Sequence, residues 1–276
     1  VIEMGANRLG EIKILCEIAS PTHGIVTNIG KAHLEGFKSY ENIIKTKSEL
    51  YKFIEKEAGI IFVNNEDNLL MELSKTIPRI TYGKNKESNI QAKIKNTFPF
   101  INVQHDKIII KSNLIGEFQF YNIAASICIG KKFNISDLKI KKSIENYIPK
   151  NNRSEVIKTK RNNLILDAYN ANPSSTKLMI TSFYKMKTKN KICIIGDMLE
   201  LGKYAKAEHE KIVSLCNKYQ IKSIFIGKEF STIINTNSFQ DINELITSDL
   251  IQTLTNSTIL LKGSRSIQLE NLVKYL

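Results

Sequence analysis

Asp167, Asn170 and Asn172 follow an apolar segment at positions where their side chains could bind a polar ligand. Residues 163–166 are typical of a buried strand, and the residues from Ser174 to Lys187 favour a helix with Ser174 as its N-cap. In a parallel α/β sheet, ligands collect beyond the carboxyl ends of the strands. The sequence therefore predicts a site here, next to a helix N-terminus that favours phosphate. The alternative is that these residues only stabilise a turn, which Asp and Asn also do.

A second set of polar residues follows apolar segments near the start of the chain. Glu3 lies in the segment Val1–Met4, which we expect to form a strand, and Thr27 and Asn28 begin a polar loop that reaches His33. A carboxylate at a strand end can hold Mg²⁺, because this ion takes a few carboxylates together with phosphate oxygens. Taken one at a time, a solvated glutamate and a structural histidine are the simpler alternatives.

Lys47 lies in the segment Tyr40–Lys56, which predicts a helix whose apolar face includes Ile43 and Leu50. An exposed helical lysine is the usual case. A lysine held near metal and phosphates can instead have a lowered pKa and react as a neutral amine. Reaction with CO₂ would then convert this cation into an anionic metal ligand.

The elements that must position these residues alternate along the first half of the chain. Up to residue 83, short apolar segments alternate with amphipathic ones, which indicates βαβ units and a mainly parallel sheet. Residues 89–111 follow a β-rich pattern, and helices are expected at 121–132 and 136–145. Residues 147–152 are polar and contain a proline, as expected of a domain boundary.

The second half repeats the alternation of strands and helices. Its expected elements are buried strands at 163–167, 191–195, 223–226 and 258–261, and helices at 202–217 and 242–254. The fold class is therefore α/β, with a mainly parallel sheet in a domain at residues 1–150. A compact domain at residues 151–276 resembles the Rossmann dinucleotide-binding fold.

Composition narrows the classes of function. Of 276 residues, 42% are hydrophobic and 24% charged, and no run of about 18 apolar residues predicts a membrane span. The net charge of +13 is spread evenly, because residues 1–150 hold 22 Lys and Arg against 16 Asp and Glu, and residues 151–276 hold 18 against 11. A diffuse positive field suits nucleotides at least as well as nucleic acid. The four cysteines are widely spaced, which favours free thiols in a reducing cytosol.

Short motifs that follow one another in both halves of the chain resemble those of the Mur ligase family. The motifs of the first half are Glu3-Met4-Gly5-Ala6-Asn7, Thr27-Asn28-Ile29-Gly30-Lys31-Ala32-His33-Leu34-Glu35 and Lys47-Ser48-Glu49-Leu50-Tyr51. Those of the second half are Arg153-Ser154, Asp167–Pro173, Gly196-Asp197-Met198-Leu199-Glu200-Leu201-Gly202 and Lys262-Gly263-Ser264-Arg265. Within the family, the EMGAN and DAYNANP forms are most similar to the branch that adds D-alanyl-D-alanine to UDP-N-acetylmuramoyl-tripeptide.

The resemblance implies an ATP- and Mg²⁺-dependent peptide ligase of cytoplasmic peptidoglycan synthesis. ATP would phosphorylate the tripeptide carboxylate, and the dipeptide amine would attack the acyl phosphate. The family motifs imply these roles: Glu3, His33 and a carbamylated Lys47 bind metal; Asn122 and Gln119 contact adenine; Arg153 and Asp167 contact the nucleotide; Asn28, Asn170, Asn172, Ser264 and Arg265 contact the substrates. We expect a monomer without nucleic-acid partners.

Two departures from the family pattern affect these expectations. Gln119 stands where the family usually has Asn, which shifts the amide by one methylene. The family's phosphate-binding GTxGKT/S loop and its UDP-binding domain precede the EMGAN strand, and neither is found in this sequence, which begins at Val1 as if inside a domain. We therefore expect no ATP turnover from these residues without a segment supplied elsewhere. Another Mur ligase, a folylpolyglutamate synthase or a non-catalytic nucleotide-binding fragment remain alternatives.

Overall fold

The computed structural model describes residues 1–276, which form two compact units, Val1–Tyr147 and Ile148–Leu276. Each unit contains its own parallel sheet, as the alternating pattern predicts. None of the helices combines the length and the apolar character that crossing a bilayer requires.

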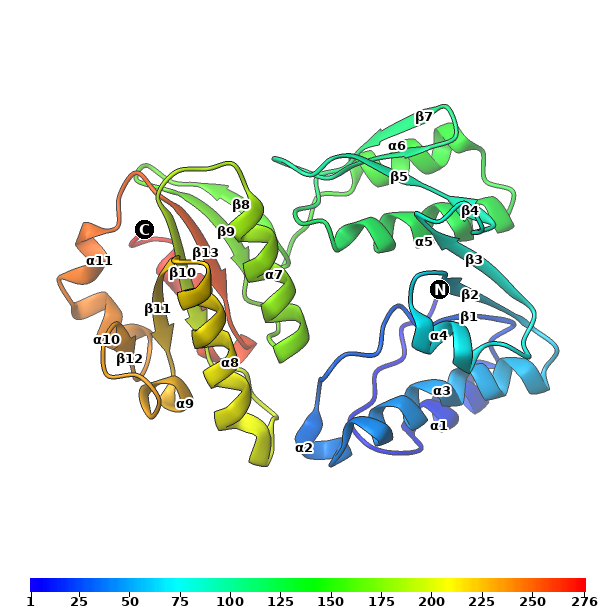
Figure 1. The fold of residues 1–276 in the computed structure, drawn as a ribbon, viewed down its shortest axis with the longest axis horizontal. Helices are drawn as coiled ribbons and strands as arrows, with labels where there is room; N and C mark the ends of the chain where they lie inside the picture. The colour runs from blue at the N-terminus through cyan, green and yellow to red at the C-terminus, as the bar shows by residue number, and fades with distance from the viewer. The chain divides into compact units, whose positions relative to one another are not determined.

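Unit 1 is built on a four-stranded parallel sheet of order β1-β2-β3-β4. Its elements are α1 (Glu11–Ala19), β1 (His23–Ile25), α2 (Leu34–Phe37), α3 (Tyr40–Lys56), β2 (Ile60–Asn64), α4 (Asn68–Leu73), β3 (Arg79–Gly83), β4 (Ile90–Gln91), β5 (Lys93–Asn96), β6 (Asn102–His105), β7 (Ile108–Lys111), α5 (Gln119–Lys132) and α6 (Asp137–Asn146). Helices α1 and α3 lie on one side of this sheet and α5 on the other (Figure 1). An antiparallel sheet of order β5-β6-β7 packs through β7 against α6.

Two apolar clusters fill the two faces of the unit 1 sheet. Tyr51 and Ile54 of α3 pack with Ile61 on one face, and Phe62 packs with Phe120 of α5 on the other. All five side chains are at most 2% exposed. Because successive strand residues point to opposite faces, Ile61 and Phe62 serve different clusters. The sheet is therefore buried on both sides, as parallel sheets usually are.

Unit 2 is built on a six-stranded sheet of order β12-β11-β10-β13-β9-β8, in which only β8 is antiparallel to its neighbour. Its elements are β8 (Glu155–Lys158), β9 (Asn163–Asp167), α7 (Pro173–Lys185), β10 (Lys191–Gly196), η1 (Gly202–Tyr204), α8 (Ala205–Lys218), β11 (Lys222–Ile226), α9 (Lys228–Ser231), β12 (Ser238–Phe239), α10 (Ile242–Thr247), α11 (Leu250–Thr253), β13 (Thr258–Lys262), η2 (Arg265–Ile267) and η3 (Leu269–Leu272). Helices α7 and α8 lie side by side (Figure 1). Strand β13 lies between β9 and β10, so the carboxyl ends of these three strands meet at one edge.

Several local expectations were wrong. Val1–Met4 forms no strand, because no strand of this chain pairs with it. The helix expected at 242–254 is two short helices, since Ser248 adopts an extended conformation that ends α10. The edge strands β8 and β12 were missed: β12 has only two residues, and β8 has no clear apolar alternation.

Candidate active site

Asp167 and Lys262 form a largely buried ion pair at the carboxyl edge of the unit 2 sheet. They are register partners on β9 and β13, and Lys262 Nζ lies 3.0 Å from Asp167 Oδ2. The Lys262 side chain is 3% exposed and that of Asp167 18%. The same ammonium also donates to the carbonyl oxygen of Asn170. Lys262 therefore fixes both the carboxylate of Asp167 and the loop that follows it.

Ser154 holds the other oxygen of the same carboxylate. The backbone N–H of Ser154 donates to Asp167 Oδ1 at 3.1 Å, and its hydroxyl lies 3.2 Å from that oxygen. Beside this pair, the guanidinium carbon of Arg153 lies 3.7 Å from the Tyr169 ring centroid, and that of Arg265 lies 5.6 Å from it. Cations are attracted to the face of an aromatic ring. The structure thus gathers Arg153, Asp167 and Arg265 in one place.

The two asparagines of the following loop differ in what they do. Asn172 is the N-cap of α7: its side-chain oxygen accepts the Ser175 N–H at 2.9 Å, while the Ser175 hydroxyl accepts the Asn172 N–H at 3.2 Å. The expectation that Ser174 caps this helix was wrong, because Pro173 already occupies the first helical position, where proline is favoured. Asn170 is exposed and contributes its backbone carbonyl to Lys262.

Ser264, another predicted site residue, is tied to the loop after β10. Its backbone N–H donates to the carbonyl oxygen of Asp197 at 3.2 Å, and its hydroxyl accepts the Leu199 N–H at 3.1 Å. Ser264 is 5% exposed, whereas the next residue, Arg265, is exposed. The loops after β10 and β13 are therefore held together at the same sheet edge as Asp167.

In unit 1, the loops that carry Glu3 and His33 lie next to each other. Gly36 of α2 approaches Asn7 so closely that an added Cβ would lie 2.3 Å from the Asn7 carbonyl oxygen. Glu3 is exposed, and His33 is half-buried in a left-handed conformation with φ 53° just before α2. Asn28 is exposed in the loop that follows β1, with its side-chain amide 3.5 Å from the Thr27 hydroxyl.

Lys47 is half-buried on α3, and burial lowers the pKa of its ammonium. Two positions later, the Glu49 carboxylate accepts the backbone N–H groups of Gly10 at 3.2 Å and Lys13 at 2.9 Å. Glu49 thereby binds the N-terminus of α1 to α3, where a negative charge is favoured by the helix dipole. The motif around Lys47 thus holds the start of α1, which follows the segment that carries Glu3.

Gln119 and Asn122 lie together in the first turn of α5. The Asn122 amide donates to Gln119 Oε1 at 2.7 Å, and the Asn122 side chain is exposed. Residues three apart on a helix are neighbours on its surface, so the extra methylene of Gln119 does not prevent this contact. The pair offers amide donors and acceptors of the kind that could bind a purine edge.

No group of three or more His, Cys, Asp or Glu side chains gathers in a way that could hold a metal ion. The four cysteines are buried and unpaired. Sequence reasoning assigned no role to Lys262, Tyr169 or Ser154, although Lys262 and Tyr169 lie within recognised motifs and Ser154 follows Arg153 directly. Lys262 meets Asp167 only through the strand order, since β13 pairs with β9. Tyr169 is close to Asp167 in the sequence, and Ser154 reaches its carboxylate from the residues just before β8.

The comparisons with known proteins agree along the chain. The Mur ligase middle domain matches residues 1–130, and the Mur ligase glutamate ligase domain matches residues 152–265. The chain is 28% identical over 305 aligned positions to UDP-N-acetylmuramoyl-tripeptide--D-alanyl-D-alanine ligase of Rickettsia prowazekii, covering 100% of this chain and 65% of the relative.

Solved structures give the same result. MurF from Acinetobacter baumannii superposes with a TM-score of 0.87 at 26% identity, over 99% of this chain and 63% of that one. MurF of Thermotoga maritima, solved in complex with ADP, shares the fold with a TM-score of 0.83 at 24% identity, over 99% and 65%. The chain thus spans just under two thirds of the length of these relatives.

Proposed function

Because the chain belongs to the Mur ligase family, whose middle and C-terminal domains it carries, we propose that it is a peptide ligase of peptidoglycan synthesis. The proposed reaction joins D-alanyl-D-alanine to UDP-N-acetylmuramoyl-tripeptide in the cytoplasm and consumes ATP. The observation that carries this proposal is the similarity, over the full length of this chain, to ligases that bear this name. The proposed substrates are those in the name of this relative.

In this proposal, unit 1 binds the adenine and the metal. Asn122 and Gln119 present amide groups to the base. Glu3 is proposed to supply a carboxylate, the kind of ligand that Mg²⁺ prefers, and His33 an imidazole, while waters and phosphate oxygens would complete the shell of the ion. A lowered pKa fits a Lys47 amine that reacts with CO₂ and then helps to hold a second ion. Bound Mg²⁺ would offset the charge that develops during phosphoryl transfer.

Residues of unit 2 are proposed to contact the nucleotide and the peptide substrates. Arg153 is proposed to bind phosphate, since a guanidinium forms bidentate hydrogen bonds with such groups. Asp167, held by Lys262 and Ser154, is proposed to accept from the nucleotide. Asn28 of unit 1 and Asn170, Asn172, Ser264 and Arg265 of unit 2 are proposed to contact the two peptide substrates. For Asn172 this leaves its amide nitrogen, because its oxygen caps α7.

The test is a ligase assay with the segment that the longer relatives possess. The part of the Rickettsia prowazekii relative that precedes its match to Val1 is fused to this chain, and product formation is followed by mass spectrometry with ATP, tripeptide precursor and D-alanyl-D-alanine. We expect product only with all three substrates. Product with a single amino acid in place of the dipeptide would assign the chain to another branch of the family. ADP binding by calorimetry without product from the fusion would support a non-catalytic nucleotide-binding role.

A further inference from the structure

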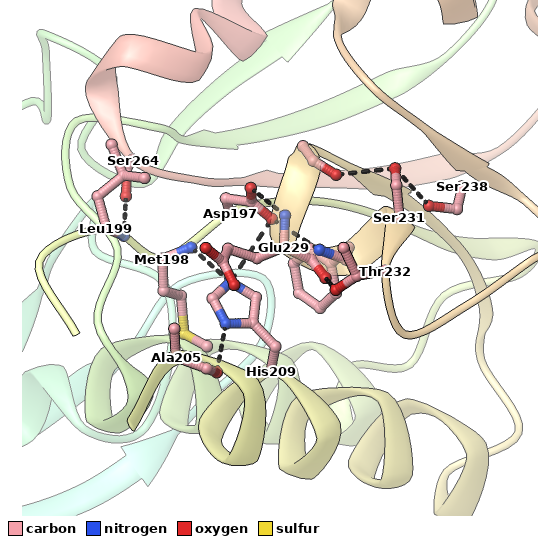
Figure 2. A network of polar contacts seen from close by, with 12 residues as sticks. Asp197, Met198, Leu199, Ala205, His209, Glu229, Ser231, Thr232, Ser238 and Ser264 are labelled. Carbon is pink, nitrogen blue, oxygen red and sulfur yellow. Dashed lines mark hydrogen bonds and ion pairs between the residues drawn. The ribbon is translucent and has the colours of Figure 1, made fainter. Parts of the chain in front are cut away.

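His209 is a fully buried histidine that the proposed chemistry does not use. It lies on α8 with 0% exposure (Figure 2), and its ring packs edge-to-face with the Phe230 ring at a centroid distance of 4.5 Å. A charged imidazole without a strong partner would be costly at such a position. The contacts of the ring show how it avoids that cost.

The hydrogen bonds of His209 fix its protonation state. Its Nε2 accepts the backbone N–H of Met198 at 3.0 Å, and its Nδ1 lies 2.8 Å from the carbonyl oxygen of Ala205. A backbone N–H can only donate and a carbonyl can only accept, so Nδ1 carries the proton and Nε2 does not. The ring is therefore neutral, and the Asp197 carboxylate 3.5 Å from Nε2 is a neighbour without a hydrogen bond to it.

The loop that His209 holds is also fixed on its other side. The Asp197 carboxylate accepts the backbone N–H of Glu229 at 2.9 Å (Figure 2) and that of Phe230 at 3.1 Å, both in α9. Asp197 is 3% exposed and Met198 1%. The first residues after β10 are thus anchored to α9 by Asp197 and to α8 by His209, so their backbone has one defined path.

That path determines where Ser264 lies. The Asp197 carbonyl and the Leu199 N–H, on either side of Met198, make the two hydrogen bonds that hold Ser264 (Figure 2). The Ser264 oxygen accepts the Leu199 N–H. The hydroxyl hydrogen of Ser264 is not used in this bond and can be donated to another acceptor. A shift at Met198 would move both contacts of Ser264 at once.

We infer that His209, as a neutral ring, is a positioning residue that sets Ser264 for the acceptor dipeptide through Met198 and Leu199. This inference rests on the proposed function, in which Ser264 contacts D-alanyl-D-alanine. His209 itself is buried, so it acts through the loop. Two hydrogen bonds connect α8 to the carboxyl edge of the sheet: His209 accepts the Met198 N–H, and Ser264 accepts the N–H of the next residue, Leu199.

The first measurement needs no turnover. Amide hydrogen exchange is followed by NMR in the 276-residue chain and in its His209→Phe and His209→Gln variants. Phenylalanine keeps a ring beside Phe230 but forms neither hydrogen bond, whereas glutamine can both accept and donate. We expect exchange at Met198 and Leu199 to become at least tenfold faster in His209→Phe, relative to Ile194 in the adjacent strand, and to be largely restored in His209→Gln. Unchanged exchange at both amides would overturn the inference.

The second measurement uses the fused ligase and Cys216→Ala as a control. Cys216 is a fully buried residue of the same helix, about two turns beyond His209, so this variant reports general loosening of α8. We expect His209→Phe to raise KM for D-alanyl-D-alanine at least fivefold and leave KM for ATP within twofold, with His209→Gln intermediate. Equal changes in both KM values, or the same pattern in Cys216→Ala, would show a structural role alone and overturn the inference. If the unsubstituted fusion makes no product, the proposed function fails. The hydrogen-exchange measurement then still tests whether His209 holds the loop at Met198 and Leu199.

Discussion

Lys262 and Asp167 are direct register partners on adjacent parallel strands, and their side chains form an ion pair across the carboxyl edge of the sheet. The pair joins DAYNANP to KGSR, two motifs that lie about 90 residues apart in the sequence. Burying a lysine that is only 3% exposed strongly destabilises a protein unless an opposite charge compensates it. The Asp167 carboxylate provides that charge, so the ion pair stabilises the carboxyl edge of the sheet.

We predict that Lys262→Met lowers the free energy of unfolding by about 3 kcal/mol, because it leaves the Asp167 charge without its cation in a largely buried site. The double variant with Asp167→Asn should recover part of this loss, since no uncompensated charge remains. Urea unfolding of both variants measures the difference. Lys222→Met, at an exposed position of β11, is the control and should change stability by less than about 0.5 kcal/mol. An equal loss of stability in Lys262→Met and in the control Lys222→Met would contradict the role of the ion pair.

Asn172 is predicted to stabilise α7 through its N-cap. Asn172→Ala should lower the free energy of unfolding by about 1 kcal/mol, whereas Asn172→Ser should keep most of the stability because serine can accept the same N–H. Thermal unfolding at constant pH measures both. A larger loss of unfolding free energy in Ser174→Ala than in Asn172→Ala would show that Ser174 is the N-cap.

Gly227 is predicted to be required where β11 meets α9. Its φ is +130°, and an added Cβ would lie 2.2 Å from the Asp197 carboxyl carbon. Gly227→Ala should therefore lower the free energy of unfolding by about 3 kcal/mol or more. The backbone would be strained, and the Asp197 carboxylate would be displaced from the N–H groups of Glu229 and Phe230. Gly5→Ala is the matched control, because a Cβ added there would have no atom within 4 Å beyond those of its chain neighbours. Denaturant midpoints that fall equally for both variants would argue against this requirement.

The stability of the chain is predicted to fall in alkaline solution. Burial raises the pKa of the Cys128 thiol to about 12, whereas in the unfolded chain it titrates near the usual value. Between about pH 9 and pH 12 the unfolded chain has lost a proton that the folded chain keeps. Unfolding then releases a proton, so its free energy decreases as pH rises, by about 1.4 kcal/mol per pH unit for one such thiol.

Urea unfolding at pH 8, 9.5 and 11 measures this slope. The Cys128→Ala variant, compared with itself across the same pH values, should show a shallower slope. Cys193 and Tyr121 contribute in the same direction, since burial also raises the pKa of the Cys193 thiol and raises that of Tyr121 to about 12. A stability independent of pH over this range would show that these groups are accessible to water.

Asn122→Ala is predicted to weaken ADP binding about tenfold, the equivalent of one lost hydrogen bond to the base. Gln119→Asn, which restores the amide position usual in the family, should leave affinity the same or raise it. Calorimetric titration with ADP measures both. Ser126→Ala is the control, because its hydroxyl bonds only to the Asn122 carbonyl oxygen one turn away. Equal affinities for Asn122→Ala and the unsubstituted chain would exclude Asn122 from the nucleotide site.

The sequence by itself determined the fold class and most of the elements. The period of the apolar residues predicted α3 at Tyr40–Lys56 and β9 at Asn163–Asp167, because periodicity follows directly from burying one face of a helix or both faces of a strand. The motifs also identified the family, which the domain matches confirm. The assigned roles of Glu3, His33 and Lys47 stay predictions.

Only the tertiary structure decided which side chains meet. Strand order places β13 between β9 and β10, and this alone brings Lys262 to Asp167 and Ser264 to Asp197. The N-cap of α7 is Asn172 and not the expected Ser174, because the cap is determined by φ and ψ at a single residue. His209 gave no signal in the sequence, since a lone histidine is defined by what packs around it. Local patterns determine the elements, and contacts between residues far apart in the sequence determine the site.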